Sequence, residues 1–146
     1  MKQALFYIVN KQDEPDSMNP AHFTFACQQI AALYRQGKRI QVWTSSQEDA
    51  CLVDEILWTF ESDSFIPHNL ENEGPRYGAP VEIAWTQTKS KREILVNLAE
   101  NAPAFASNYK QIIDFVPTQE ALKQLARERF KHYRGLGYTM QTIDTE

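Results

Sequence analysis

The sequence lacks the glycine-rich turn with which many α/β proteins hold phosphate groups. It contains five glycines, and none of them lies in the segment 10–19 between the first apolar run and the first predicted helix. Neither GxGxxG nor GxxxxGK[ST] occurs. The same segment contains Asp13, Glu14 and Asp16, whose negative charge would repel a phosphate. We therefore predict that no nucleotide binds at the position usual for such folds.

Cysteine and long hydrophobic runs are also scarce. Cys27 and Cys51 fall at apolar positions of predicted helices and form no CxxC motif, so we expect two buried thiols and no disulfide. No apolar run reaches the length of about 18 residues that a membrane-spanning helix needs, and the segment 1–9 lacks the length and cleavage site of a signal peptide. These absences predict a soluble, cytoplasmic protein with no membrane partner.

Strand-like and helix-like patterns alternate along the 146 residues, a length typical of one domain over 1–146. The apolar runs predict strands at 4–9, 39–44, 81–86, 93–98 and 111–115. Helices are expected from Asn19 and Pro20 to Gly37, from the capping box 45–48 through Trp58, around 103–109, and from Thr118 to Gly135 or Gly137. This alternation indicates a mainly parallel, doubly wound α/β sheet, resembling a mononucleotide-binding fold without a phosphate-binding loop.

The predicted C-terminal helix has two different faces. One is an apolar stripe, along which the stem of Arg129 is expected to lie: Leu122, Leu125, Ala126, Tyr133 and Leu136. The other combines four cations with an aromatic ring expected to be exposed: Lys123, Arg127, Phe130, Lys131 and Arg134.

The charge of this helix differs from that of the chain. The segment 117–137 holds five basic and two acidic residues, whereas the whole chain has a net charge of −4. A basic island on an acidic protein indicates a local anionic partner. A solvated helix face and a direct nucleic-acid binder remain alternatives, and the second should bind single-stranded DNA with a steep salt dependence.

Two features of the middle segment have ambiguous chemistry. His68 and Glu82, with Glu71 and Glu73 nearby, can be drawn as an acid/base or metal cluster, which would suit a small α/β hydrolase or metal-dependent enzyme. A single histidine without a second histidine or cysteine at ligand spacing is a weak metal signal, however.

Large aromatic residues flank the same irregular segment. Trp58, Phe60 and Phe65 follow one another closely, and they belong either to the core or to a protein-binding patch. Their position beside an irregular loop favours partial exposure.

Four distinctive stretches, at 64–70, 74–85, 114–117 and 122–131, resemble the chi subunit family of bacterial DNA polymerase III holoenzyme. The resemblance implies a non-catalytic accessory protein with no catalytic residue, cofactor or metal. It also implies one-to-one pairing with the psi subunit, attachment to the clamp loader through psi, and binding of the C-terminal tail of single-stranded DNA-binding protein. DNA would be contacted only indirectly, at the nucleoid-associated replisome of the bacterial cytoplasm.

The family's tail-binding positions fall on four residues of the cationic face, Lys123, Arg127, Phe130 and Lys131, and Arg134 lies on the same face. The family often has tyrosine where this chain has Phe130, so the ring is kept and a hydroxyl donor is lost.

For the psi contact the resemblance points to Trp58 and Phe65, whereas Phe60 matches less well. In some members the same patch is implied to serve a repair helicase as an alternative partner.

Overall fold

The computed structural model describes residues 2–10, 19–59, 66–71, 79–86 and 92–145. The strands within these ranges are β1 (Gln3–Ile8), β2 (Ile40–Trp43), β3 (His68–Leu70), β4 (Val81–Ala84), β5 (Ile94–Asn97), β6 (Gln111–Val116) and β7 (Thr139–Asp144). The helices are α1 (Ala21–Arg35), α2 (Gln47–Thr59) and α3 (Glu120–Gly135), with a short 3-10 turn η1 (Ala106–Asn108).

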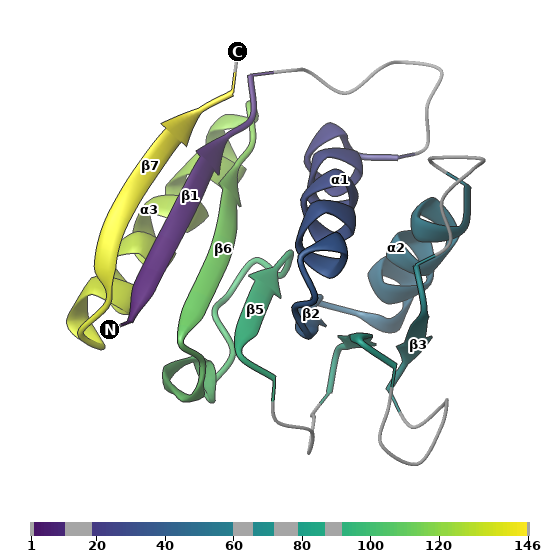
Figure 1. The fold of residues 1–146 in the computed structure, drawn as a ribbon. Helices are drawn as coiled ribbons and strands as arrows, with labels where there is room; N and C mark the ends of the chain where they lie inside the picture. The colour runs from purple at the N-terminus through teal and green to yellow at the C-terminus, as the bar shows by residue number, and fades with distance from the viewer. Residues whose placement is uncertain (1, 11–18, 60–65, 72–78, 87–91, 146) are drawn as a thin grey trace.

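The strands form one sheet in the order β3-β4-β2-β5-β6-β1-β7, and every neighbouring pair is parallel. The predicted parallel sheet is therefore confirmed. The chain leaves β1 through α1 towards β2, and it leaves β6 through α3 in the opposite direction, towards β7. Because crossovers between parallel strands are right-handed, these opposite directions place α1 and α3 on opposite faces of the sheet (Figure 1).

Two hydrophobic clusters fill the space between the sheet and its helices. The cluster under α1 and α2 includes Ile30, Val53 and Ile113, and the cluster under α3 includes Phe6 and Tyr133. Side chains of one strand alternate between the two faces, so consecutive residues of β6 contribute to different clusters. The continuous apolar runs of the central strands reflect this burial on both faces.

Two strands, β3 and β7, were not predicted from the sequence. β3 has only three residues, beside the irregular segment. β7 is largely exposed, with just two of its six residues partly buried, so it has none of the apolar run that revealed β1. The helix predicted at 103–109 is only the 3-10 turn η1.

Helix starts were predicted less well than helix ends. α3 begins at Glu120 with Gln119 as its N-cap, so the expectation for Thr118 was wrong, and Pro20 rather than Asn19 precedes α1. Ser46 caps α2, because its Oγ accepts a hydrogen bond from the Asp49 amide at 3.1 Å.

The predicted glycine ends of α1 and α3 are confirmed. Gly37 and Gly137 have φ angles of +82° and +96° and allow the chain to turn out of each helix.

The two cysteines differ in their surroundings. Cys27 is buried, as expected, and burial raises the pKa of its thiol. Cys51 is exposed on α2, so the prediction of a second buried thiol was wrong. In the described ranges no helix is both long and apolar enough to cross a membrane.

Candidate protein-interaction surfaces

A buried carboxylate on β6 fixes α3 to the sheet. Arg129 donates from Nε to Asp114 Oδ2 and from Nη2 to Asp114 Oδ1, both at 2.9 Å. The Tyr133 hydroxyl donates to Oδ2 at 2.8 Å, and Asn97 Nδ2 donates to the same oxygen at 3.1 Å. Asp114 is fully buried, so this two-pronged ion pair and its neutral donors satisfy a charge that would otherwise be costly to bury.

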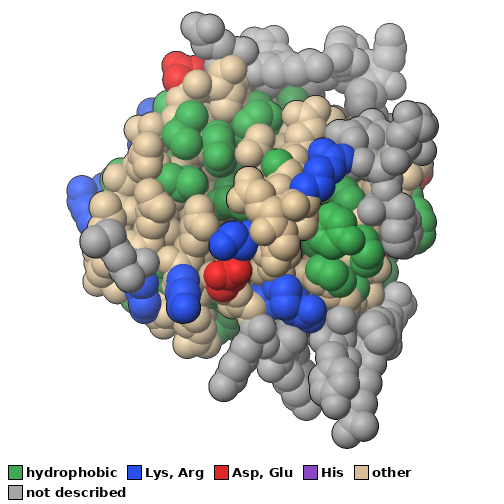
Figure 2. Space-filling view, in the orientation of Figure 1, with side chains coloured by type: hydrophobic (Ala, Val, Ile, Leu, Met, Phe, Trp, Pro, Cys, Tyr) green, Lys and Arg blue, Asp and Glu red, His purple; other side chains and the backbone are tan. Residues whose placement is uncertain are grey.

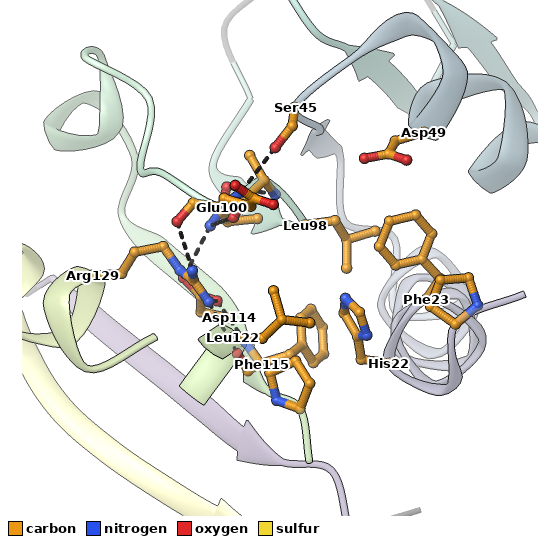
Figure 3. A pocket seen from close by; sticks show the side chains of 14 residues that line it. His22, Phe23, Ser45, Asp49, Leu98, Glu100, Asp114, Phe115, Leu122 and Arg129 are labelled. Atoms are coloured by element: carbon orange, nitrogen blue, oxygen red, sulfur yellow. Dashed lines mark hydrogen bonds and ion pairs between the residues drawn. The ribbon is translucent and has the colours of Figure 1, made fainter. Parts of the chain in front are cut away.

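The guanidinium of Arg129 has further acceptors at the carboxyl end of the sheet. It donates to the carbonyl oxygens of Glu100 and Phe115 at 2.8 and 3.1 Å (Figure 3). Burial by itself would lower the pKa of Arg129, but the neighbouring Asp114 carboxylate raises it, so the side chain stays charged. Burial also raises the pKa of the Tyr133 hydroxyl, and Asp114 raises it further, so the hydroxyl keeps the proton that it donates.

This network was not predicted from the sequence. Arg129 was expected only to lay its stem along the apolar stripe, and Asp114 was part of a predicted strand with no role of its own. The available signal was a pair of opposite charges at core positions: one carboxylate inside the apolar strand 111–116 and one arginine on the apolar stripe of the next helix.

Outside this anchor, α3 carries the five residues predicted as its second face, which we name the basic flank: Lys123, Arg127, Phe130, Lys131 and Arg134. The cations at 127, 131 and 134 are exposed, and Lys123 is partly buried. Phe130 is not the exposed ring that we expected, because it is partly buried with its centroid 5.3 Å from that of Phe6 on β1. The Arg134 guanidinium lies 6.0 Å from the centre of the Phe130 ring.

Arg127 has only weak contacts within α3. Its Nη1 atom lies 3.3 Å from Gln124 Oε1 and 3.6 Å from Glu120 Oε1, and all three side chains are exposed. Exposed contacts of this kind contribute at most about 1 kcal/mol, so a better acceptor can replace them.

Figure 2 shows the face that turns away from α3. Several lysine and arginine side chains also lie near one another on its lower half, around one acidic side chain, so cations are not confined to α3. The basic flank differs in that its four cations and a partly buried ring share one side of a single helix.

The second candidate surface is the end of α2. Trp58 is 55% exposed and is the one large hydrophobic side chain of the described ranges with that much exposure. Its ring packs edge-on against His68, with centroids 5.1 Å apart. Phe60 and Phe65 lie outside the described residues, so of this predicted patch the structure places Trp58 alone.

Both ring nitrogens of His68 contact other groups of the fold. Its side chain is almost fully buried, with Nδ1 2.6 Å from the Ile66 carbonyl oxygen and Nε2 3.0 Å from Asp54 Oδ1. The second contact has the distance of an ion pair without hydrogen-bond alignment. His68 therefore joins β3 to α2 beneath Trp58.

His68 and Glu82 do not form the acid/base or metal cluster that the sequence left as an alternative, and Glu73 lies outside the described residues. His68 is in register with Val81, whereas Glu82 is in register with Asn69, so the two side chains point to opposite faces of the sheet. Glu71, which had been grouped with them, accepts hydrogen bonds from the Trp85 and Thr86 amides and from the Thr86 hydroxyl. Within the described ranges no three metal-ligating side chains come together.

A cavity of about 190 Å³ lies at the carboxyl ends of β5 and β6, where doubly wound sheets commonly bind ligands. Asp49 and Glu100 bring negative charge to it, and the pKa of Asp49 is raised by burial and by the nearby Glu48 and Glu100 (Figure 3). The one guanidinium in the lining, Arg129, is already occupied by Asp114 and two carbonyl oxygens. This environment disfavours a phosphate in the cavity.

The known proteins that this chain resembles belong to one family. The sequence profile of the family described as DNA polymerase III chi subunit, HolC, matches residues 1–141. The chain is 42% identical to the DNA polymerase III subunit chi of Escherichia coli (strain K12) over 144 residues, which is 97% of both chains. It is 40% identical to that of Haemophilus influenzae over 119 residues, 80% of this chain and 83% of the relative. The chain belongs to the DNA polymerase III chi family.

Membership in the chi family makes the chain an accessory subunit of a DNA polymerase and not its catalytic subunit. The resemblance identified from the four sequence stretches is thereby confirmed.

Proposed function

We propose that this chi-family chain is a replication adaptor that binds the C-terminal tail of single-stranded DNA-binding protein on the basic flank of α3. The chain would pair one to one with psi and reach the clamp loader through it, in the bacterial cytoplasm. The observation that carries the proposal is the basic flank itself. Cations gather around a half-buried ring on a chain of net charge −4, on a helix that Asp114 and Arg129 fix to the sheet.

The chemistry of such a tail suits this flank. The tail is acidic and ends in an apolar residue with a free carboxylate, so it needs an apolar contact, a carboxylate donor and diffuse positive charge. Arg127 is one helical turn from both Lys123 and Lys131, which places it at the centre of the flank. Its planar fork can bind a carboxylate with two parallel hydrogen bonds, which a lysine cannot do.

The expected affinity is moderate. Phe130 is already half-buried against Phe6, so covering the rest of its ring contributes only about 1 kcal/mol. Exposed ion pairs contribute about 0.2–1 kcal/mol each, and immobilising a flexible peptide opposes them. We expect a dissociation constant in the micromolar range, corresponding to about −8 kcal/mol. Many tails on one coated DNA strand would raise the effective concentration.

Isothermal titration with a peptide of the tail tests this function. Arg127→Ala removes the charge-assisted contact at the centre of the flank and should weaken binding by roughly ten- to a hundredfold, about 1.5–3 kcal/mol. Arg127→Lys should bind the tail peptide more tightly than Arg127→Ala and less tightly than the parent chain. Lys110→Ala is the matched control, because it removes an exposed cation that lies just before β6, outside α3. Unchanged binding by Arg127→Ala would show that the basic flank is only a solvated surface.

For psi, we propose the patch that contains Trp58 and Phe65. An indole that is more than half exposed at the end of a helix supports this assignment, because large exposed rings are typical of protein-binding hot spots. The His68 ring contacts the indole edge-on, and this contact helps to position the Trp58 side chain. A repair helicase is the alternative partner for the same patch.

A further inference from the structure

The strand β7 ends the sheet next to the basic flank. It pairs with β1 on one side, and in the part of the chain that the structure describes no strand pairs with its other side. An unpaired strand edge presents a row of backbone donors and acceptors to which another extended chain can bind.

The hydrogen bonds to β1 define which residues of β7 face outward. The Thr139 amide donates to the Lys2 carbonyl oxygen at 2.9 Å, and the Thr145 amide donates to the Ile8 carbonyl oxygen at 3.2 Å. Backbone groups of a strand point to alternate sides, so the odd-numbered residues face β1. The amide and carbonyl of Thr142, and likewise those of Met140, therefore point away from the sheet.

This edge has few of the usual protections against pairing. The six residues of β7 include no proline, glycine or lysine, and its one charged residue, Asp144, lies at the carboxyl end of the strand. Its backbone is therefore open to an added strand.

The basic flank lies over the same edge. Met140 packs in the core cluster under α3, and Thr142 shares its face of the sheet by alternation. Thr142 is in register with Phe6, whose ring contacts Phe130. The flank from Lys123 to Arg134 and the strand β7 each extend roughly 16 Å, so they match in length.

We propose that the acidic tail binds as an additional strand on the free edge of β7, with its backbone paired to Met140 and Thr142 and its acidic side chains under the cations of α3. This inference rests on the proposed function and adds a mode of binding to it. An added strand would lie about 4.8 Å beyond β7, within reach of long lysine and arginine side chains.

Charge selects the tail over a second copy of this chain as the occupant. Two copies paired through β7 would bring two basic flanks together, and like charges at an interface are unfavourable. An extended acidic peptide instead places opposite charges beside the flank.

Thr142→Pro tests the pairing directly. Proline removes the outward amide of Thr142 and leaves the hydrogen bonds to β1 in place, since those come from odd-numbered residues. Isothermal titration with the tail peptide should show a loss of roughly tenfold, whereas the control Thr142→Ala keeps the amide and should bind like the parent chain. Circular dichroism and a thermal melt check that the variant is folded.

A second measurement does not depend on the folding of a variant. A series of tail peptides, each N-methylated at one backbone amide, should lose affinity at alternate positions if the peptide pairs as a strand. The inference is overturned if Thr142→Pro is folded and binds like the parent chain, or if the methylated series shows no alternation.

The two proposals can fail separately. Loss of binding in Arg127→Ala together with an unaffected Thr142→Pro and a flat methylation series would keep the tail on the basic flank and reject the added strand. A parent chain that does not bind the tail at all would reject the proposed function.

Discussion

Consecutive residues of β6 enter two differently built interfaces. Phe115 points towards α1, where its ring lies 6.1 Å from those of Tyr7 and Phe25. Asp114 points towards α3, where it accepts hydrogen bonds from Arg129 and Tyr133. Apolar packing has little directional preference, whereas a bidentate ion pair permits only a narrow range of orientations. The contacts on the α1 side of the sheet thus bury apolar side chains without fixing one orientation. The contacts on the α3 side also fix the orientation of α3, the helix that presents the basic flank.

The largest expected effect comes from breaking the directional interface. Asp114→Ala leaves the buried Arg129 guanidinium without its counter-charge, which should lower the free energy of unfolding by about 3–5 kcal/mol. On the other face, Ile113→Val removes one methylene group and should cost only about 0.5–1.5 kcal/mol. Urea denaturation of the two variants measures the difference.

A double variant shows whether the stability lost in Asp114→Ala comes from the unpaired charge of Arg129 or from lost packing. If the uncompensated charge causes the loss, Asp114→Ala with Arg129→Met should be more stable than Asp114→Ala alone. Equal or lower stability of the double variant would mean that the network contributes mainly through its packed volume.

The next largest effect is a difference between the two interaction surfaces in how much their aromatic residues contribute to stability. Trp58→Ala should abolish co-purification with psi and change the free energy of unfolding by less than about 0.5 kcal/mol, because the indole is 55% exposed. Phe130→Ala should behave differently and destabilise the fold by about 1–2 kcal/mol, because its ring is half-buried against Phe6. Thermal melts measure the stability of both variants, and pull-downs measure their binding to psi. A strongly destabilised Trp58→Ala would show that the indole serves the fold.

A smaller effect should appear at alkaline pH. Because the pKa of Tyr133 is raised in the folded state, the unfolded chain ionises first, above its ordinary value of about 10. The stabilisation is complete below that pH and declines as the pH rises towards the folded-state pKa. Tyr133→Phe should lower stability by about 1 kcal/mol at neutral pH and show a shallower decline above pH of about 10. An identical alkaline decline in both proteins would contradict this role of Tyr133.

The smallest effect concerns salt. Raising the salt concentration from about 0.05 to 0.3 M should weaken tail binding, which depends on exposed cations, and leave the apolar psi contact nearly unchanged. Titrations at several salt concentrations measure both dependences. Tight, salt-dependent binding of single-stranded DNA by the chain alone would favour the direct nucleic-acid binder instead.

The sequence by itself determined the features that depend on local periodicity. The buried strands appear as apolar runs, and the basic flank follows from the 3.6-residue repeat, so both could be derived without coordinates. The four distinctive stretches also sufficed to indicate the chi family, to which the chain belongs.

Tertiary structure alone decided which distant residues meet. β7 has no apolar signal and exists because β1 offers it a parallel partner, more than 130 positions earlier in the chain. The exposure of Phe130 is set by Phe6 on that same strand, and strand register places His68 and Glu82 on opposite faces. The partner of Arg129 is likewise set by the packing of α3 on β6. These outcomes depend on contacts between separate elements, and a local sequence pattern does not specify which distant residues make them.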